Sequence, residues 1–202
     1  MSGTAPVLIL ASASRTRADL LKKAGIAFVQ DPADIDESAL KDDFKRRRRT
    51  AAEAARALAY AKAKDVAKRR PTDIVLGTDQ ILSCDGNWFD KPADMVLAKA
   101  QLYGLRGRSH DLETAACVVR GNRVLWEHHE TPRLTVRPFG SPFIEAYLRR
   151  EGKRVLSSVG AYRLEGPGLQ LFSKVEGDHF TIQGLPLLAL LQFLRWQGLV
   201  DE

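Results

Sequence analysis

Cysteine is scarce in this sequence, and its spacing does not suggest a metal site. The two cysteines, Cys84 and Cys117, lie far apart along the chain, and both fall in apolar runs typical of strands. This spacing excludes the paired-cysteine motifs of zinc sites and dithiol redox centres. We expect two buried free thiols in a reducing compartment.

Long hydrophobic runs are also missing. The most apolar stretch, residues 185–194, is about half as long as a membrane-spanning helix requires. The first apolar run begins at Val7, is short, and follows no basic segment, so it does not have the composition of a secretory leader. The sequence therefore predicts a cytoplasmic protein with no membrane partner.

The sequence contains neither of the two common glycine-rich phosphate loops, GxxxxGK[ST] and GxGxxG. Aromatic residues make up only 7% of the chain, and we find no nucleic-acid-binding motif, which argues against a nucleic-acid partner. The net charge of +6 is nevertheless concentrated, because the run from Lys45 to Arg49 is entirely cationic. Such a run is typical of a solvated loop, and binding of nucleic acid or polyphosphate through it is the alternative.

The remaining composition, 45% hydrophobic and 28% charged, suits one globular domain over residues 1–202. Strand-like and helix-like patterns alternate, which is typical of an α/β fold. Strands are expected at residues 7–10, 26–29, 73–82, 110–119 and 123–136, the last two as a hairpin. Helices are expected from about residue 20 and at residues 50–69, 92–104, 141–150 and 186–197. Residues 31–43 are expected to form an acidic loop, and residues 155–183 glycine-punctuated strands and turns.

Residues 7–21, VLILASASRTRADLL, are the most informative segment. A short buried strand ends in the hydroxyls of Ser12 and Ser14, and the guanidiniums of Arg15 and Arg17 precede a helix. Backbone N–H groups, hydroxyls and the helix dipole converge on an anion in such an arrangement, and arginine matches phosphate oxygens. The segment therefore predicts a phosphate-binding loop. Serines that act as ordinary caps, with solvated arginines, are the alternative.

Two charged residues lie where the pattern predicts burial. Asp79 follows the apolar run Ile74–Leu76, where a carboxylate costs several kcal/mol of desolvation unless it is paired. It suits a general base or a metal ligand, and a carboxylate that caps a loop is the alternative. Lys62 shares a predicted helix face with Leu58 and Val66. On this spacing alone we favour a lysine that extends to solvent over one that meets a buried anion.

Other charged residues are weaker candidates. Lys91 precedes a proline-started helix and suits either a phosphate site or a surface loop. Asp36 and Glu37 lie in the acidic stretch, where one carboxylate together with Asp79 has the chemistry to hold Mg²⁺ or Mn²⁺; a solvated loop is the alternative. His110 is expected to have a structural role, and contact with substrate is the alternative.

Three motifs resemble those of the Maf family of nucleotide pyrophosphatases: ASASxxRxxLL at residues 11–21, GTDQ at 77–80 and GLPL at 184–187. The resemblance covers nearly the whole chain. It implies an α/β domain with a long twisted mixed sheet and two lobes around a deep cleft, and commonly a homodimer. It also implies hydrolysis of a nucleoside triphosphate substrate to the monophosphate and pyrophosphate, with a divalent metal, in the removal of non-standard nucleotides.

The resemblance also implies roles for single residues. Asp79 matches the family's general base and Glu37, weakly preferred to Asp36, the acid that joins Asp79 at the metal. Arg17 matches the retained arginine, whereas Arg15 stands at the usual proline position and its role is open. The triphosphate would be bound by Ser12, Ser14, Arg17, Lys62 and Lys91.

Three positions bear on the preferred base by resemblance: Thr16, Gln80 and Glu165. Members that act on dTTP and UTP typically have Arg, Thr and Gln there, so this chain differs at all three. Gln80 and Glu165 agree with the branch that includes the 7-methyl-GTP pyrophosphatases, which have an aromatic residue at the position of Thr16. The prediction is a pyrophosphatase of the non-dTTP branch. A 7-methyl-GTP-specific enzyme, a nucleotide sensor without turnover and a nucleic-acid binder that uses Lys45 to Arg49 are the alternatives.

Overall fold

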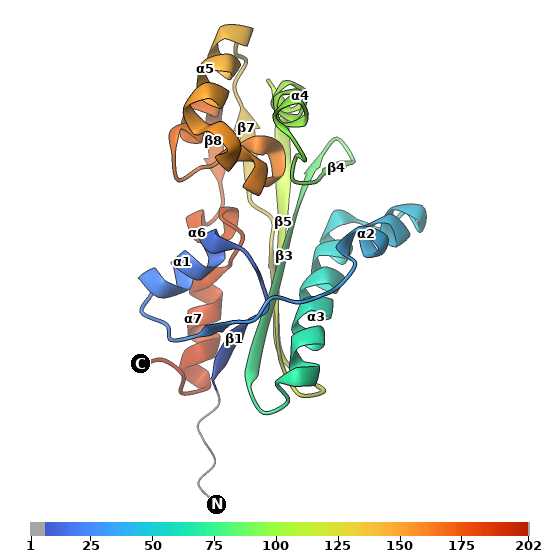
Figure 1. Ribbon diagram of the computed structural model, residues 1–202, viewed down its shortest axis with the longest axis vertical. Coiled ribbons are helices and arrows are strands. Elements are labelled where there is room, and N and C mark those ends of the chain that lie inside the picture. The colour runs from blue at the N-terminus through green and yellow to red at the C-terminus, as the bar shows by residue number, and fades with distance from the viewer. Residues whose placement is uncertain (1–6, 202) are drawn as a thin grey trace, which may run out of the picture. The chain divides into compact units, whose positions relative to one another are not determined.

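The computed structural model describes residues 7–201 (Figure 1). The strands are β1 (Leu8–Leu10), β2 (Val29–Gln30), β3 (Ile74–Cys84), β4 (Asn87–Phe89), β5 (Ser109–Arg120), β6 (Arg123–Glu130), β7 (Arg133–Val136) and β8 (Phe172–Glu176). The helices are α1 (Arg15–Lys23), α2 (Glu37–Arg46), α3 (Ala51–Arg69), α4 (Met95–Leu105), α5 (Ser141–Glu151), α6 (His179–Ile182) and α7 (Leu187–Trp196). Three 3₁₀ segments lie at Gly152–Ser157, Val159–Ala161 and Pro167–Leu171.

These strands form a mixed sheet, which confirms the predicted α/β class. Its order is β2-β1-β3-β5-β7-β8, with β4 paired to β3 and β6 paired to β5. Strand β1 runs parallel to β2 and β3, whereas β4, β6, β7 and β8 pair antiparallel to their neighbours. In the part of the chain that is described, no helix is both long and apolar enough to cross a bilayer.

The chain divides into two compact units. The first comprises the chain up to Gln80, Thr114–Glu130 and the chain from Asp178; the second comprises Ile81–Glu113 and Thr131–Gly177. Strands β3 and β5 each pass from one unit into the other. The number of units agrees with the two lobes that the family resemblance implies.

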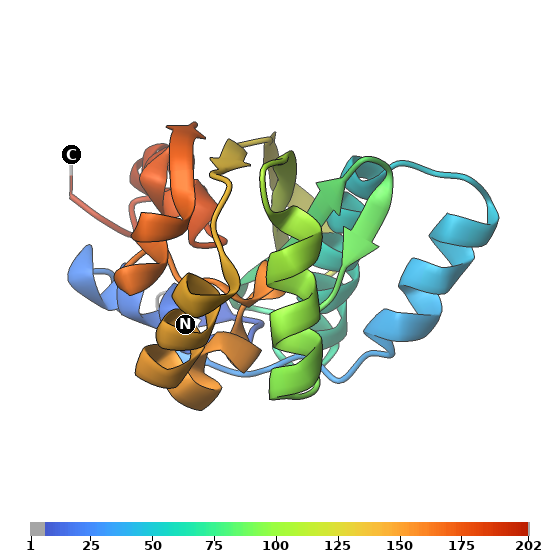
Figure 2. The ribbon, with the colours of Figure 1, turned by 90° about the horizontal axis from the view of Figure 1, so that it is seen from above.

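In the first unit, helices cover both faces of the parallel strands. Helices α1 and α7 lie on one side of β1 and β3, and α3 lies on the other, in both views (Figures 1 and 2). Leu8–Leu10 pairs in register with Ile74–Leu76, and all six of these residues are buried. Burial on both faces explains why these strands are continuous apolar runs rather than alternating ones.

In the second unit, β4 returns along the end of β3, and β7 pairs with both β5 and β8. Helices α4 and α5 lie side by side in this unit (Figure 2). Its core includes a small aromatic group, in which the ring of Phe172 packs against those of His110 and Tyr162.

Helix α3 approaches strand β3 closely at Gly77. A Cβ atom at this glycine would lie 2.1 Å from the carbonyl oxygen of Ala59 and 2.6 Å from the backbone nitrogen of Ala63. Alanines dominate the buried positions of α3, so the two backbones can come together. Since side chains two residues apart share a face of a strand, the face that carries Gly77 also carries Asp79.

Side-chain caps explain most helix starts. Thr50 and Glu53 form the predicted capping box at the start of α3, each accepting from the backbone N–H of the other. Ser14 caps α1 by accepting from the backbone N–H of Arg17. Asp94 caps α4, so this helix begins at Met95 and not at residue 92 as predicted.

The predicted acidic loop at residues 31–43 is wrong in its second half. Asp36 accepts from the backbone N–H of Ala39 and starts helix α2 at Glu37. The cationic run is therefore partly helical, since Lys45 and Arg46 lie in the last turn of α2. Cations are favoured at that end of a helix by its dipole.

Other predicted boundaries were also wrong. Helix α1 begins at Arg15 and not near residue 20, so Arg15 and Arg17 lie in its first turn. The hairpin strand at residues 123–136 is interrupted at Pro132, which has no N–H to donate to a ladder, so β6 ends before it and β7 begins after it. The strand predicted at residues 26–29 is confined to Val29–Gln30, since the backbone N–H of Ile26 donates to the carbonyl of Leu21 at the end of α1. Residues 155–183 contain the strand β8, but 3₁₀ segments and α6 make up much of the rest.

Both cysteines are buried free thiols, as predicted. Burial raises the pKa of Cys117 to about 12, and the nearby Glu127 carboxylate acts in the same direction. Burial also raises the pKa of Cys84. Neither thiol is therefore an activated nucleophile at neutral pH.

Replacing Gly77 by alanine should destabilise the fold by about 3 kcal/mol or more, because the added methyl group would meet backbone atoms that cannot move separately. The measurement is the free energy of unfolding from denaturant titration. Gly104→Ala in helix α4 is the matched control: its Cβ would meet only Phe89, at 3.9 Å. We expect this control to change stability by less than about 1 kcal/mol, towards stabilisation. Equal losses in both variants would contradict the close approach.

Candidate active site

A buried ion pair forms the centre of the site. The ammonium nitrogen of Lys62 lies 2.5 Å from Oδ1 of Asp79, and the two residues are only 7% and 4% exposed. The lysine therefore meets a buried anion instead of extending to solvent, which corrects the interpretation that the sequence alone favoured. The pairing also offsets the desolvation that the position of Asp79 entails.

The second oxygen of Asp79 is different. Oδ2 is buried and has no hydrogen-bond partner among residues 7–201. Buried polar atoms are usually satisfied, so one that is not is often tied to function. A carboxylate with one oxygen held by a lysine and the other free of protein donors is suited to accept a proton or bind a cation.

Lys62 also contacts a second carboxylate. Its ammonium lies 2.9 Å from Oε1 of Glu37, the first residue of α2. The adjacent Asp36 uses its side chain to cap α2, so Glu37 is the acid that reaches the site. The structure thus brings Glu37, and not Asp36, to Lys62, and the role of Glu37 at a metal stays a prediction.

The donor set fits a hard divalent cation that also binds substrate. No group of three or more His, Cys, Asp or Glu side chains within residues 7–201 could hold a metal alone. Glu37 and Asp79 offer oxygen ligands, and Mg²⁺ is usually bound through one or two carboxylates together with substrate phosphates. The donor set therefore fits such a cation, with Glu37 as the acid that lies beside Asp79.

The guanidinium of Arg17 joins three segments of the first unit. Nε donates to the carbonyl of Gly184 at 2.8 Å, and Nη1 donates to the carbonyl of Thr78 at 3.0 Å and to the hydroxyl of Ser12 at 3.3 Å. The hydroxyl of Thr78 also donates to Gly184, at 2.9 Å. The ASAS loop, β3 and the GLPL segment are thus held together, and Nη2 is the one nitrogen of this guanidinium that bonds no protein acceptor within the described chain.

Charge at the site is nearly balanced. Burial lowers the pKa of Arg17, while the charges of Asp79 and then Glu37 act in the opposite direction. Two cations, Arg17 and Lys62, therefore face two carboxylates. A polyanionic ligand would add negative charge that this set does not offset, which again favours a site that takes up a metal cation with its ligand.

The serines of the first loop are engaged with their own backbone. Ser14 accepts from the N–H of Arg17 at 3.3 Å, and Ser12 accepts from the N–H of Ser14 at 3.2 Å. The side chain of Gln30 donates to the carbonyl of Ser12 at 2.7 Å and fixes the loop from β2. Ser14 is therefore a cap, as the alternative interpretation held, and Thr16 lies partly buried in the first turn of α1. Phosphate binding by this loop stays a prediction.

Gln80 lies on the strand face opposite to Asp79. Its amide nitrogen donates to the hydroxyl of Thr114 at 2.8 Å and lies 3.1 and 3.2 Å from the carbonyls of Thr181 and Ile182. Carbonyl oxygens can only accept, so these contacts fix which end of the amide faces them. Gln80 can therefore offer a ligand only its carbonyl oxygen, as an acceptor.

The other predicted residues belong to the second unit. Lys91 is exposed and precedes α4. Glu165 accepts from Nε of Arg163 at 3.2 Å, and Nη1 of the same guanidinium donates to Glu151 at 3.3 Å. Glu151 is 4% exposed, so this buried carboxylate fixes the arginine that holds Glu165.

Several of these contacts were not predicted. Nothing in a single sequence marks Thr78 or Gln30 as partners of the first loop, since both lie far from it along the chain. The pairing of Glu151 with Arg163 likewise joins two separate segments. The spacing of Lys62, Asp65 and Arg69 along α3, in contrast, is a signal that was present and was missed, because it places three charged residues on one helix edge.

The sequence is similar to known proteins over most of its length. Residues 7–197 match the family model described as Maf-like protein. The chain belongs to the Maf family. A nucleoside triphosphate pyrophosphatase of Granulibacter bethesdensis is 49% identical to this Maf protein over 188 residues, which cover 93% of the chain and 95% of the relative.

Of two further relatives, one has the same name as the first relative and the other has a different name. A nucleoside triphosphate pyrophosphatase of Paramagnetospirillum magneticum is 50% identical over 190 residues, or 94% of this chain and 98% of its own. A 7-methyl-GTP pyrophosphatase of Rhizobium meliloti is 47% identical over 196 residues, or 97% of this chain and 98% of its own. The Maf chain is thus similar over most of its length to proteins of both names.

His110 of the second unit is buried, and its Nε2 lies 2.7 Å from the hydroxyl of Tyr162. Its Nδ1 is buried without a partner among the described residues. Burial lowers the pKa of His110 to about 4. This agrees with the structural role expected from the sequence.

The stability of the protein should therefore depend on pH through His110. Between pH 6.5 and 4, His110 binds a proton in the unfolded chain but not in the folded protein. The contribution of neutral His110 to the free energy of unfolding is therefore complete above pH 6.5 and is lost as the pH falls towards 4. The loss at pH 4.5 should be about 2–3 kcal/mol. Denaturant unfolding at pH 7.5 and 4.5 measures it, with His110→Gln as the variant that lacks it. The same pH dependence in both proteins would contradict the assignment.

Proposed function

We propose that this Maf-family protein hydrolyses nucleoside triphosphates to nucleoside monophosphates and pyrophosphate. The observation that carries the proposal is the state of Asp79, a buried carboxylate with one oxygen held by Lys62 and the other without a protein donor. The names of the relatives support the same reaction. Because their similarity extends over nearly the whole chain, it includes every segment that builds the site.

In this reaction, Asp79 acts as the general base. Its Oδ2 accepts a proton from a water molecule whose oxygen bonds to the α-phosphorus. The bond from that phosphorus to the bridging oxygen breaks, and pyrophosphate leaves with the electron pair. Lys62 compensates the charge of the carboxylate and keeps its oxygens in place, so that catalysis consists mostly of positioning and electrostatics.

Glu37 and Asp79 would hold a divalent cation, Mg²⁺ or Mn²⁺. When bound, this cation offsets the charge that develops on the leaving pyrophosphate. The triphosphate would be bound by side chains that offer cations or hydroxyl donors: Ser12, Ser14, Arg17, Lys62 and Lys91. Arg17 contributes through Nη2, since its other nitrogens hold the protein segments together.

The preferred base should carry N–H donors. Gln80 presents a carbonyl oxygen only, and Glu165 presents a carboxylate, so both groups accept hydrogen bonds. Guanine has such donors on N1 and N2. A 7-methyl-GTP pyrophosphatase is therefore the second candidate, although Thr16 offers no aromatic surface for stacking on a cationic base. The wider proposal is a cytoplasmic enzyme, active as a homodimer, that removes non-standard nucleotides.

A turnover screen tests the reaction. Normal and modified nucleoside triphosphates, including 7-methyl-GTP, are incubated with Mg²⁺ or Mn²⁺, and the products are separated. We expect monophosphate and pyrophosphate, loss of activity on chelation, and kcat/KM for guanine-type substrates at least about tenfold above dTTP. Formation of diphosphate and phosphate, or no turnover across the panel, would contradict the proposal. Salt-dependent binding to nucleic acid would then favour a role for Lys45 to Arg49.

Asp79→Asn should lower kcat by at least about a hundredfold, because the amide cannot accept the proton from water. The circular dichroism spectrum should be unchanged, since Asn has the same shape and Lys62 keeps Glu37 as a partner. The matched control is Asp85→Asn, an exposed turn residue of the second unit, which should retain wild-type rates. An Asp79→Asn protein with wild-type turnover would exclude Asp79 as the base.

A further inference from the structure

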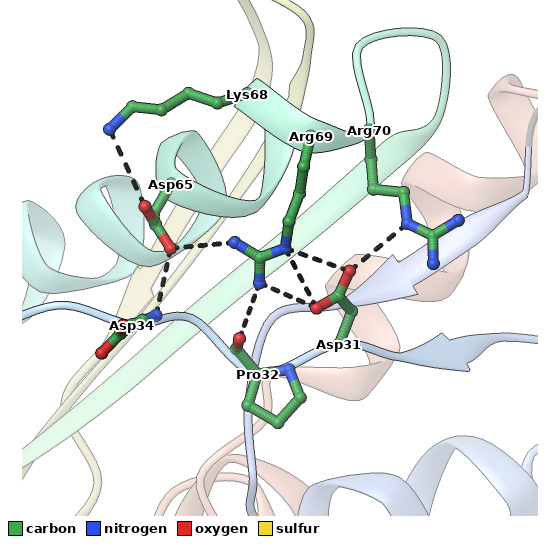
Figure 3. Close-up of polar contacts among 7 residues, drawn as sticks. All are labelled: Asp31, Pro32, Asp34, Asp65, Lys68, Arg69 and Arg70. Atoms are coloured by element: carbon green, nitrogen blue, oxygen red, sulfur yellow. Dashed lines mark hydrogen bonds and ion pairs between the residues drawn. The ribbon is translucent and has the colours of Figure 1, made fainter.

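One edge of helix α3 carries three charged residues, Lys62, Asp65 and Arg69, spaced so that they share a face. All three contact residues 31–37. The order of the contacts is antiparallel, because the segment advances from Arg69 to Lys62 as its numbering rises. Figure 3 shows the two contacts farther from the site. The third is the contact between Lys62 and Glu37.

The contact farthest from the site is a network around Arg69. Its Nη2 donates to Oδ1 of Asp31 at 2.7 Å and to the carbonyl of Pro32 at 2.8 Å, and its Nε lies 3.2 and 3.3 Å from the two carboxylate oxygens (Figure 3). Arg70 adds a bond to the same carboxylate at 3.3 Å. The bonds from Arg69 are the main reason that the pKa of Asp31 is lowered.

The middle contact holds the backbone of the segment. Oδ2 of Asp65 accepts the N–H of Asp34 at 3.0 Å and a bond from Nη1 of Arg69 at 3.2 Å (Figure 3). Asp65 therefore joins the arginine network to the peptide three residues before Glu37. The Asp65 carboxylate fixes the main chain of the segment, whereas the contact between Arg69 and Asp31 fixes mainly a side chain.

Few other contacts hold the start of α2. Strand β2 pairs with β1 through two exposed residues, and α2 has no fully buried residue along its length. Apolar packing between Val29 and Arg46 is limited to half-buried side chains, namely Ile35, Leu40 and Phe44, so the polar contacts with α3 contribute substantially to where the start of α2 lies. We propose that Arg69 and Asp65 are positioning residues that hold Glu37 against Lys62 at the Asp79 site.

This inference rests on the proposed function of the Asp79 site, and it extends that function to residues outside the site. Arg69 and Asp65 act on catalysis through Glu37, the acid expected at the cation. Single exposed ion pairs are weak, but here a bidentate arginine, a second arginine and a backbone N–H act together. Because the Arg69 side chain is 43% exposed, its loss should move Glu37 without unfolding the first unit.

Hydrogen exchange of the ligand-free protein tests the positioning directly. In Arg69→Gln, the amides from Asp34 to Leu40 should exchange about tenfold faster than in the wild type. Arg49→Gln is the matched control, since Arg49 also forms an exposed ion pair on α3, with Glu53 at 3.2 Å. It should leave these amides unchanged. Equal exchange in wild type and Arg69→Gln would overturn the inference.

A double-mutant cycle shows whether Arg69 acts through Glu37. Arg69→Gln should lower kcat/KM about tenfold in the wild-type background and by less than about twofold when Glu37→Gln is already present. Arg69→Lys keeps the charge but not the two-pronged guanidinium, so its kcat/KM should lie between those of the wild type and Arg69→Gln. Mn²⁺ binding, followed by electron paramagnetic resonance, should weaken in parallel. Independent losses that multiply in the double variant would overturn the inference.

The two tests separate this inference from the proposed function. A wild-type protein that hydrolyses no nucleoside triphosphate would contradict the function, while the exchange comparison would still decide whether Arg69 positions residues 34–40. Normal turnover in the wild type with unchanged exchange in Arg69→Gln would overturn the positioning role alone.

Discussion

The arrangement of the first unit depends on one buried ion pair, Lys62 with Asp79. Neither charge is stable there alone, so the pair requires helix α3 and strand β3 to approach each other closely. Gly77 and the small residues of α3 permit that approach, and Gly77 stands on the same strand face as Asp79. The other charged groups of the site lie around this pair: Glu37 forms a second ion pair with Lys62, and Arg17 carries the second positive charge.

Parts of this site could be predicted from the sequence because they leave a local trace. An aspartate directly after a buried apolar run indicates an unusual carboxylate, and T-x-x-E predicts a helix start. The partner of Lys62 could not be predicted from spacing, since a helix face indicates burial but not what it meets. Helix α2 was missed because its apolar stripe is short: only Leu40 and Phe44, one turn apart, mark it among charged residues, and none of its residues is a core position.

The residues proposed to recognise the base are held in two different ways. Gln80 is oriented by hydroxyl and carbonyl groups, so its direction does not depend on ionisation. Glu165 is held by Arg163, which in turn depends on the buried carboxylate of Glu151. One acceptor is thus fixed by neutral hydrogen bonds and the other by ion pairs, and salt screens the pair of Arg163 with Glu151 only weakly because Glu151 is buried. The two acceptors proposed to contact the base therefore differ in what orients them, although contacts within the protein hold both.

The alanine-rich face of α3 sets a limit on how this chain can evolve. Alanines at positions such as 59 and 63 are held to a small volume by the strand beneath them, whatever their polarity. An enlargement there shifts the helix outward, and the lysine on its buried face moves with it. Substitutions that enlarge this face would therefore disturb the charge pair and the packing of the first unit together, so the active site and the fold cannot change independently here.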